Sequence, residues 1–455
     1  MSEGVSPARR VAYSTLSSWR EGQEFLEDLL EGKAERAALS REDRRLAHAL
    51  VFGVARRLRL LDFWIDSLSS KGLASLPAPV ADIERIALFQ LAFLERIPAH
   101  AVVHEAVAQC SQAGVSGLKG VVNATLRNFS RKRAELEQKL ATRPNRVGIE
   151  TSHPDWLVEW AIARWELPKA TLWLNANNEI PSSFLWPLSS RLLKSEELER
   201  APEEKGRSAA KHLVERLGIG ELSPEGEAVV LPAGTVIGDL PAFREGLAEI
   251  QDPAAREAVK LLDPQPGEKV LDLCCAPGGK TLQIADKVRG LGELVAVDSS
   301  AERLVRVSEN LERCGFPSVE VLRRDLLEPW GDWEGRADAV LLDAPCSGLG
   351  TLRRRVDLRY RITPNDFAEL AEKAALLLDN AARLVRPGGR LVYSTCTLSA
   401  QENEAVVAGF IESHSDGWRP VRSGYFPPWL APGEDPPFPS EAPASDASYS
   451  ALLLK

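Results

Sequence analysis

The sequence of 455 residues has little of what marks secreted or membrane proteins. Six cysteines are too few for a disulfide framework, which predicts reduced thiols and a cytoplasmic protein. No apolar run approaches the roughly 18 residues of a membrane span, and Met1 opens no signal-like segment. A net charge of −9 argues against a protein that coats nucleic acid indiscriminately. Any nucleic-acid partner must therefore be bound by local patches.

The pattern along the chain predicts a multidomain protein. Residues 1–140 show helical periodicity throughout and predict an all-α domain. Residues 145–240 mix short segments with prolines and predict a small α+β connecting domain. Residues 241–455 alternate strands with helices, one of which is expected to start at Pro364 after an N-cap at Thr363. This alternation predicts an α/β, Rossmann-like, doubly wound parallel sheet, and the proline-rich residues 426–443 predict an irregular surface segment.

A glycine turn lies between a predicted strand and a predicted helix, in Leu271-Asp-Leu-Cys-Cys-Ala-Pro-Gly-Gly-Lys-Thr281. A phosphate-binding P-loop would need glycine where Cys274 stands, and the dinucleotide fingerprint G-x-G-x-x-G is absent. S-adenosylmethionine fits better, because it needs an open loop and an acid at the next strand end for its ribose. Asp298 stands at that position, and Asp325 ends the third strand, where an adenine edge would lie. Either aspartate alone is more typical of helix capping.

Two cysteines follow neighbouring predicted strands, in Asp343-Ala-Pro-Cys346 and Ser394-Thr-Cys396. Methylation of a pyrimidine at C5 needs a thiolate that adds to C6, because C5 alone is too weakly nucleophilic. Inert packing is the alternative for any buried cysteine. A metal site is not expected, because C-x-x-C is absent and the six histidines are scattered.

The strings LDLCCAPGGKT, LLDAPCSGLGTLRR and VYSTCTLSAQENE resemble the RNA cytosine-C5 methyltransferases of the Nop2/Sun family. The resemblance implies that Cys396 is the nucleophile and that Cys346 assists release of the methylated RNA. It also implies that Lys280 and Asp343 lie near the target base. The cofactor-binding residues that it implies are Cys274, Cys275, Ala276, Pro277, Gly278, Gly279, Lys280, Asp298, Asp325 and Asp343.

The N-terminal region, with ERIPAHAVVHEAV from Glu95 and VNATLR from Val122, resembles a NusB-type RNA-binding domain. This combination is similar to bacterial methyltransferases of small-subunit ribosomal RNA. The resemblance implies that small-subunit ribosomal RNA is the partner and that the enzyme is a monomer. Two alternatives stay open: the same chemistry on transfer RNA or another RNA, and a non-catalytic ribosome-assembly factor. The sequence departs from the family after the Pro-Cys loop, where the usual Arg-Arg-x-Pro-Asp-x-x-Trp reads Arg354-Arg-Val-Asp-Leu-Arg-Tyr360.

An arginine run follows the Pro-Cys loop directly. Its members are Arg353, Arg354, Arg355, Arg359 and Arg361. Such a run predicts phosphate contacts that position RNA without reading its sequence. The alternative is an ordinary solvated loop.

Overall fold

The computed structural model describes residues 4–199, 201–432 and 445–455. Most of the proline-rich segment lies outside these residues. The chain forms two compact units, and the first unit is made of one long and one short segment of the sequence. Unit 1 consists of residues 1–179 and 355–361, and unit 2 of residues 180–354 and 362–455. Among the described residues, no helix is both long and apolar enough to cross a membrane.

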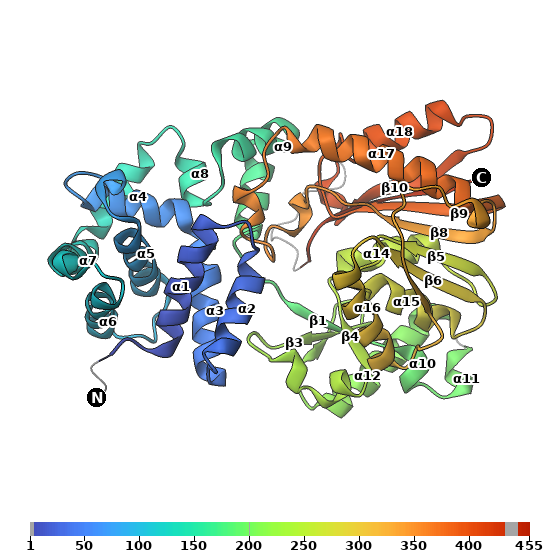
Figure 1. The fold of residues 1–455 in the computed structure, drawn as a ribbon, viewed down its shortest axis with the longest axis horizontal. Coiled ribbons are helices and arrows are strands. Elements are labelled where there is room, and N and C mark those ends of the chain that lie inside the picture. The colour runs from blue at the N-terminus through green and yellow to red at the C-terminus, as the bar shows by residue number, and fades with distance from the viewer. Residues whose placement is uncertain (1–3, 200, 433–444) are drawn as a thin grey trace. The chain divides into compact units, whose positions relative to one another are not determined.

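Unit 1 is helical (Figure 1). Its helices are α1 (Pro7–Glu21), α2 (Leu26–Arg36), α3 (Arg41–Arg56), α4 (Leu58–Leu68), α5 (Ala78–Phe93), α6 (Ala99–Gln112), α7 (Lys119–Ala141), α8 (Arg146–Glu150) and α9 (Asp155–Ala176). Apolar side chains at helical spacing, such as Leu50, Ile83 and Leu126, are fully or almost fully buried in one core. Burial of these faces is the main stabilising term for such a unit.

Residues 355–361, here called the strap, complete this helical core. Val356 is fully buried among the apolar side chains of unit 1. Asp357 accepts a hydrogen bond from the backbone N–H of Leu26 at 3.0 Å, and so caps α2, whose own N-cap Phe25 has no side-chain acceptor. The strap is therefore an integral part of unit 1.

Unit 2 begins with a small antiparallel sheet in the order β2-β3-β1-β4. The elements up to the end of this sheet are β1 (Ser183–Pro187), α10 (Ser189–Leu192), α11 (Ser195–Leu198), α12 (Pro202–Leu217), β2 (Glu221–Leu222), β3 (Val229–Leu231), α13 (Pro241–Arg244) and β4 (Ala248–Ile250). Leu185, Leu213 and Val229 are fully buried in its core.

The rest of unit 2 is a seven-stranded sheet in the order β10-β11-β9-β8-β5-β6-β7. Its elements are α14 (Pro253–Leu262), β5 (Lys269–Leu273), α15 (Gly279–Val288), β6 (Glu293–Asp298), α16 (Ala301–Cys314), β7 (Glu320–Arg323), β8 (Ala337–Asp343), α17 (Asp366–Leu384), β9 (Val385–Thr395), α18 (Glu404–Ser413), β10 (Arg419–Phe426) and β11 (Ser448–Leu454). Strands β5 to β9 pair in parallel, and β11 pairs antiparallel to β9 and β10.

Helices cover both faces of this sheet, with α14, α15 and α16 on one face and α17 and α18 on the other (Figure 1). Strand interiors such as Val270, Ala296 and Leu341 are accordingly buried. The predicted fold class is confirmed, but the predicted start of one helix is wrong. Helix α17 begins at Asp366 after Asn365, and Thr363 donates its N–H and its hydroxyl to the carboxylate of Asp366 instead of capping the helix.

Candidate active site

The chain reverses direction along the sheet at β5, because β6 lies on one side of this strand and β8 on the other. The carboxyl ends of β5, β6, β8 and β9 meet around this switch point, where open α/β sheets bind ligands. The predicted site residues lie at the last positions of β6 and β8 or in the segments that directly follow β5, β7, β8 and β9.

The glycine turn after β5 is tightly packed. Gly278 caps α15 with a left-handed φ of +101°, and a Cβ at this position would lie 3.3 Å from the Cα of Val307 in α16. Cys274 also has a positive φ, of +58°. Burial raises the pKa of its thiol to about 12, and it raises the pKa of Cys275 as well, so both remain protonated.

Asp298 at the end of β6 holds the shape of this turn. Its carboxylate accepts hydrogen bonds from the N–H of Ala276 at 3.3 Å and from the N–H of Ser300 at 3.0 Å. Arg303 donates to the carbonyl of Ala276 at 2.6 Å, and Asn310 donates to that of Pro277 at 3.3 Å. The predicted cofactor loop is thus fixed by β6 and α16.

Two further aspartates differ in exposure. Asp272 in β5 is fully buried and accepts from the Thr281 hydroxyl at 2.6 Å, while burial raises the pKa of this aspartate to about 7. Asp325 is exposed after β7 and accepts from the N–H of Leu327 at 2.9 Å. Asp298, Asp325 and Asp343 stand at strand ends around the turn. Such acids repel phosphates but attract a cation, so the donor set fits the sulfonium nucleoside S-adenosylmethionine.

Lys280 and Asp343 form an ion pair beside the turn, with 2.7 Å between Nζ and Oδ2. Burial of Lys280 opposes its charge, but Asp343 outweighs this effect, and Cys396 and Asp272 add to it. The net result is a raised pKa, so Lys280 is an ammonium ion held among the other predicted catalytic residues.

The two cysteines meet at the ends of adjacent parallel strands. Cys346 follows β8, Cys396 follows β9, and their sulfur atoms lie 3.4 Å apart. The hydrogen bond to Cys396, burial and the nearby Glu402 all raise the pKa of Cys346 well above its ordinary value. Cys346 therefore retains its proton at neutral pH and can donate it to the sulfur of Cys396.

The sequence reasoning missed Glu402, which connects the two cysteine loops. Its carboxylate accepts from the N–H of Ser347 at 2.7 Å and from the hydroxyl of Ser347 at 2.6 Å. The Ser347 hydroxyl also lies 2.6 Å from that of Thr397. Glu402 is 1% exposed, and burial raises its pKa. Its place in the quoted string VYSTCTLSAQENE, six residues after Cys396, was the available signal.

Asn403 and Gly350 complete this arrangement. Asn403 accepts from the Thr395 hydroxyl at 2.6 Å and donates to the carbonyl of Thr397 at 3.0 Å, on either side of Cys396. The N–H of Gly350 donates to the carbonyl of Cys396 at 2.9 Å. A Cβ at Gly350 would lie 2.1 Å from the carbonyl oxygen of Ala447, so only glycine fits. Backbone and side-chain contacts thus fix both thiols.

The prediction that the arginine run contacts RNA phosphates is wrong for Arg353 and Arg359, which are buried, while Arg354 and Arg361 are partly exposed but bound within the protein. Arg359 is fully buried and donates to Asn178 Oδ1 at 2.8 Å and to the carbonyl of Asn177 at 2.9 Å. Arg353 is 5% exposed. Arg354 pairs with Asp252 at 2.8 Å and Asp446 at 3.0 Å, and Arg361 donates to the carbonyls of Gln23 and Glu24. Only Arg355 is exposed.

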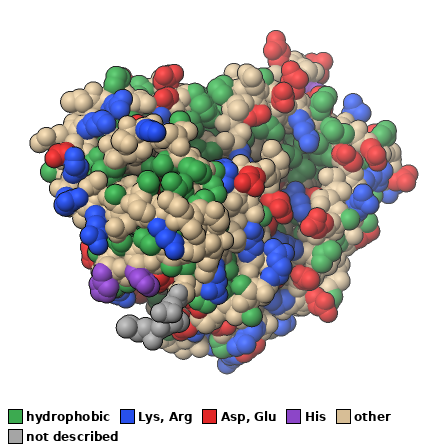
Figure 2. Space-filling view, turned by 60° about the vertical axis from the view of Figure 1, so that its left-hand side comes forward, with side chains coloured by type: hydrophobic (Ala, Val, Ile, Leu, Met, Phe, Trp, Pro, Cys, Tyr) green, Lys and Arg blue, Asp and Glu red, His purple; other side chains and the backbone are tan. Residues whose placement is uncertain are grey.

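The face drawn in Figure 2 shows no single basic patch. Its Lys and Arg side chains are interspersed with acidic and hydrophobic ones. In the part of the chain that the structure describes, no group of three or more His, Cys, Asp or Glu side chains is arranged to hold a metal ion.

The sheet order, with a glycine turn at its switch point, defines a Rossmann-like methyltransferase domain. The crystal structure of PH0851 has this fold, with a TM-score of 0.73, 21% identity and coverage of 99% of each chain. A methyltransferase homolog from Pyrococcus horikoshii, 25% identical, covers 69% of this chain and 99% of its own, with a TM-score of 0.53.

Sequence comparison identifies the family. The 16S rRNA methyltransferase RsmB/F family matches residues 259–425, and the NusB family matches residues 6–131. The probable ribosomal RNA small subunit methyltransferase B of Synechocystis is 34% identical, over 90% of each chain. The Bacillus subtilis protein with the same description is 32% identical, over 90% of this chain and 89% of its own. The chain therefore belongs to the RsmB/F family of rRNA methyltransferases and carries an N-terminal NusB domain.

Proposed function

We propose that this protein transfers a methyl group from S-adenosylmethionine to C5 of a cytidine in 16S ribosomal RNA, through a covalent bond between Cys396 and C6. The observation that carries this proposal is the pair of thiols 3.4 Å apart, beside the Lys280–Asp343 ion pair. Two thiols at one strand edge have little value for packing, but they match a reaction that needs one sulfur to attack and one to exchange protons.

The turn from Cys274 to Lys280 would hold the cofactor, together with the strand-end acids Asp298, Asp325 and Asp343. When bound, S-adenosylmethionine supplies an electrophilic methyl group. The three acids, which would repel phosphates, support this choice over a nucleotide with phosphates.

Cys396 begins the reaction as a thiolate, and its electron pair forms the bond to C6. The C5 carbon gains electron density and can form a bond to the methyl group, while the bond between the methyl group and the cofactor's sulfur would break and leave its electron pair on that sulfur. A base then removes the C5 proton, the C5–C6 double bond re-forms, and the Cys396–C6 bond breaks with return of its electron pair to sulfur. Cys346, still protonated, stabilises that departing thiolate by hydrogen bonding. Lys280, oriented by Asp343, donates a hydrogen bond to the cytosine ring.

Ribosomal RNA is the proposed partner, because the relatives are named as small-subunit rRNA methyltransferases and share the NusB domain. In this proposal residues 1–140 bind RNA, residues 145–240 connect, and residues 241–455 catalyse, in a monomeric cytoplasmic enzyme. Deletion of residues 1–140 is a poor test, because it would leave Ile149 and Val356 without the core of unit 1 into which they pack.

The test uses the full chain with radiolabelled S-adenosylmethionine, unmodified 16S rRNA and, in parallel, bulk transfer RNA. The expected result is label in 5-methylcytidine of the 16S rRNA alone. Label in transfer RNA alone would keep the chemistry and overturn the substrate. Absence of label from both, and from assembling small-subunit particles, would support a non-catalytic assembly factor instead.

A further inference from the structure

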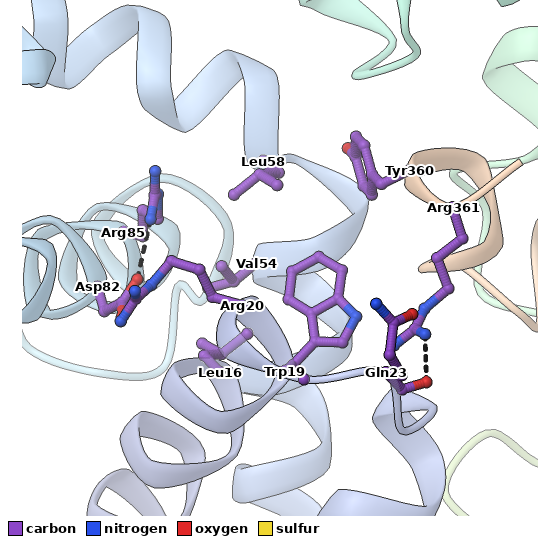
Figure 3. A pocket seen from close by; sticks show the side chains of 11 residues that line it. Leu16, Trp19, Arg20, Gln23, Val54, Leu58, Asp82, Arg85, Tyr360 and Arg361 are labelled. Carbon is purple, nitrogen blue, oxygen red and sulfur yellow. Dashed lines mark hydrogen bonds and ion pairs between the residues drawn. The ribbon is translucent and has the colours of Figure 1, made fainter. Parts of the chain in front are cut away.

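Unit 1 contains a cavity of about 480 Å³ that the proposed reaction does not use. Figure 3 shows it between the helices and the strap, and a pocket of this volume is large enough for one small organic group. Leu16, Val54 and Leu58 supply apolar walls, and Tyr360 and Arg361 of the strap close one side.

An aromatic ring forms the centre of this cavity. Trp19 from α1 is half-buried, and its ring lies edge-on to that of Tyr360, with 6.1 Å between centroids. The Tyr360 hydroxyl is committed to the carbonyls of Ala55 and Ser152, at 3.1 and 2.9 Å, so this ring is fixed in place. Trp19 thus offers a supported face against which a flat group can stack.

The charges that line the cavity are mainly positive. Arg20, Arg85 and Arg361 line it together with one acid, Asp82. Asp82 is buried and bridges Arg20 at 3.1 Å and Arg85 at 2.9 Å, so its charge is already neutralised by contact. Each arginine also pairs with a further acid, Arg20 with Glu21, Arg85 with Asp62 and Arg361 with Asp357. The charges around the cavity are therefore balanced, and its aromatic and neutral polar groups decide which ligand fits.

Two polar groups of the cavity are not used by the fold. Among the described residues, neither the indole N–H of Trp19 nor the side-chain amide of Gln23 has a hydrogen-bond partner within the protein. Figure 3 shows the indole nitrogen on the side of Gln23. Together they offer donors and an acceptor at the edge of a stacking face, which is what the edge of a nucleobase requires.

We propose that this cavity binds one unpaired nucleotide of the RNA substrate, with its base on Trp19 and the edge of the base at Gln23. The inference rests on the proposed function. The strap supports it, because Tyr360 follows Cys346 by only fourteen residues, so the chain that forms the cavity wall continues directly from the Pro-Cys loop. A nucleotide bound here would position flanking RNA without contributing to the methyl transfer itself.

The test measures binding of unmodified 16S rRNA to the full chain. Trp19→Ala is expected to lower the affinity about 5- to 150-fold, the usual value of one base–aromatic stack, while Trp19→Phe retains most of it. Gln23→Ala, at an exposed position outside the helices, is expected to lower it several-fold. Phe93→Ala is the matched control, because Phe93 is a partly exposed aromatic of unit 1 outside the cavity and is expected to leave the affinity unchanged.

Photocrosslinking of the wild-type protein to 16S rRNA that contains 4-thiouridine gives an independent readout, and the crosslinked peptide is expected to contain Trp19, Gln23 or Tyr360. Unchanged affinity of both Trp19→Ala and Gln23→Ala would overturn the proposal, as would a crosslink confined to other segments. A loss seen only with assembling particles would assign the cavity to a protein. If wild-type protein binds RNA through Trp19 but transfers no methyl group, the proposed function fails and this site remains.

Discussion

Two neighbouring segments of the chain, the Pro-Cys loop and the strap, differ in how well the sequence predicts the positions of their side chains. Cys346 lies next to Cys396, as their positions after neighbouring strands predict. The arginines that follow were expected to face RNA, but Arg359 lies in the interior of unit 1. Strand ends are placed by sheet topology, whereas a charge run carries no information about which groups it will meet.

The largest expected effect tests the roles of the two thiols. Cys396→Ala removes the proposed nucleophile and is expected to abolish both methyl transfer and any covalent RNA adduct. Cys346→Ala leaves the attack possible but impairs release, so a stable protein–RNA adduct is expected on a denaturing gel. Cys314→Ala, at a buried cysteine of the same unit away from the site, is the control. An adduct that persists in the Cys396 variant would contradict these roles.

The next effect compares how much the buried Arg359 and the exposed Arg355 contribute to the stability of unit 1. Arg359→Ala leaves a cavity and removes the donors to Asn178 and the carbonyl of Asn177, so we expect unit 1 to lose on the order of 3–5 kcal/mol. Arg355→Ala, at an exposed position, is expected to change stability by less than about 0.5 kcal/mol. Hydrogen exchange of α9 measures the difference. Equal protection in both variants would show that the strap is not part of the unit.

A third effect concerns Glu402, which acts on the thiols through Ser347 and Thr397. A glutamine at this position keeps one acceptor but loses the second, so Cys346 and Cys396 are expected to shift. We expect adduct formation in the Cys346→Ala background to slow about 100-fold, the usual cost of a misplacement near 1 Å. Glu404→Gln is the control, because Glu404 accepts from the Tyr425 hydroxyl at 2.7 Å and not from either cysteine loop.

The pH dependence of Cys346 alkylation distinguishes an electrostatic role of Glu402 from a purely structural one. The negative charge of Glu402 is one cause of the raised pKa of Cys346, so Glu402→Gln is expected to lower that pKa. Alkylation of Cys346 by iodoacetamide, followed by mass spectrometry, should then reach its midpoint at a lower pH than in the Glu404→Gln protein. A midpoint that stays in place would remove Glu402 from the electrostatics of the site.

The comparison also shows what the sequence could predict. Buried strands with alternating helices predict the sheet, and the sheet then brings Lys280, Asp343, Cys346 and Cys396 to one edge. Glu402 and the strap depend on contacts across long sequence separations. Glu402 reaches Ser347, 55 residues earlier, and Asp357 caps a helix 331 residues earlier. No local periodicity encodes such partners, since any acid can cap or pair with several donors.

The smallest effect concerns Arg355, the most exposed member of the arginine run, for which the phosphate contact stays a prediction. Arg355 is exposed, so a phosphate contact there would release counterions without reading sequence. Arg355→Ala is expected to weaken binding of 16S rRNA and transfer RNA by a similar factor and to lower the salt slope by about one. Filter binding at several salt concentrations measures both. Since the Arg355 side chain is exposed, an unchanged slope would exclude a phosphate contact at this position and would place RNA binding on other surfaces of the two units.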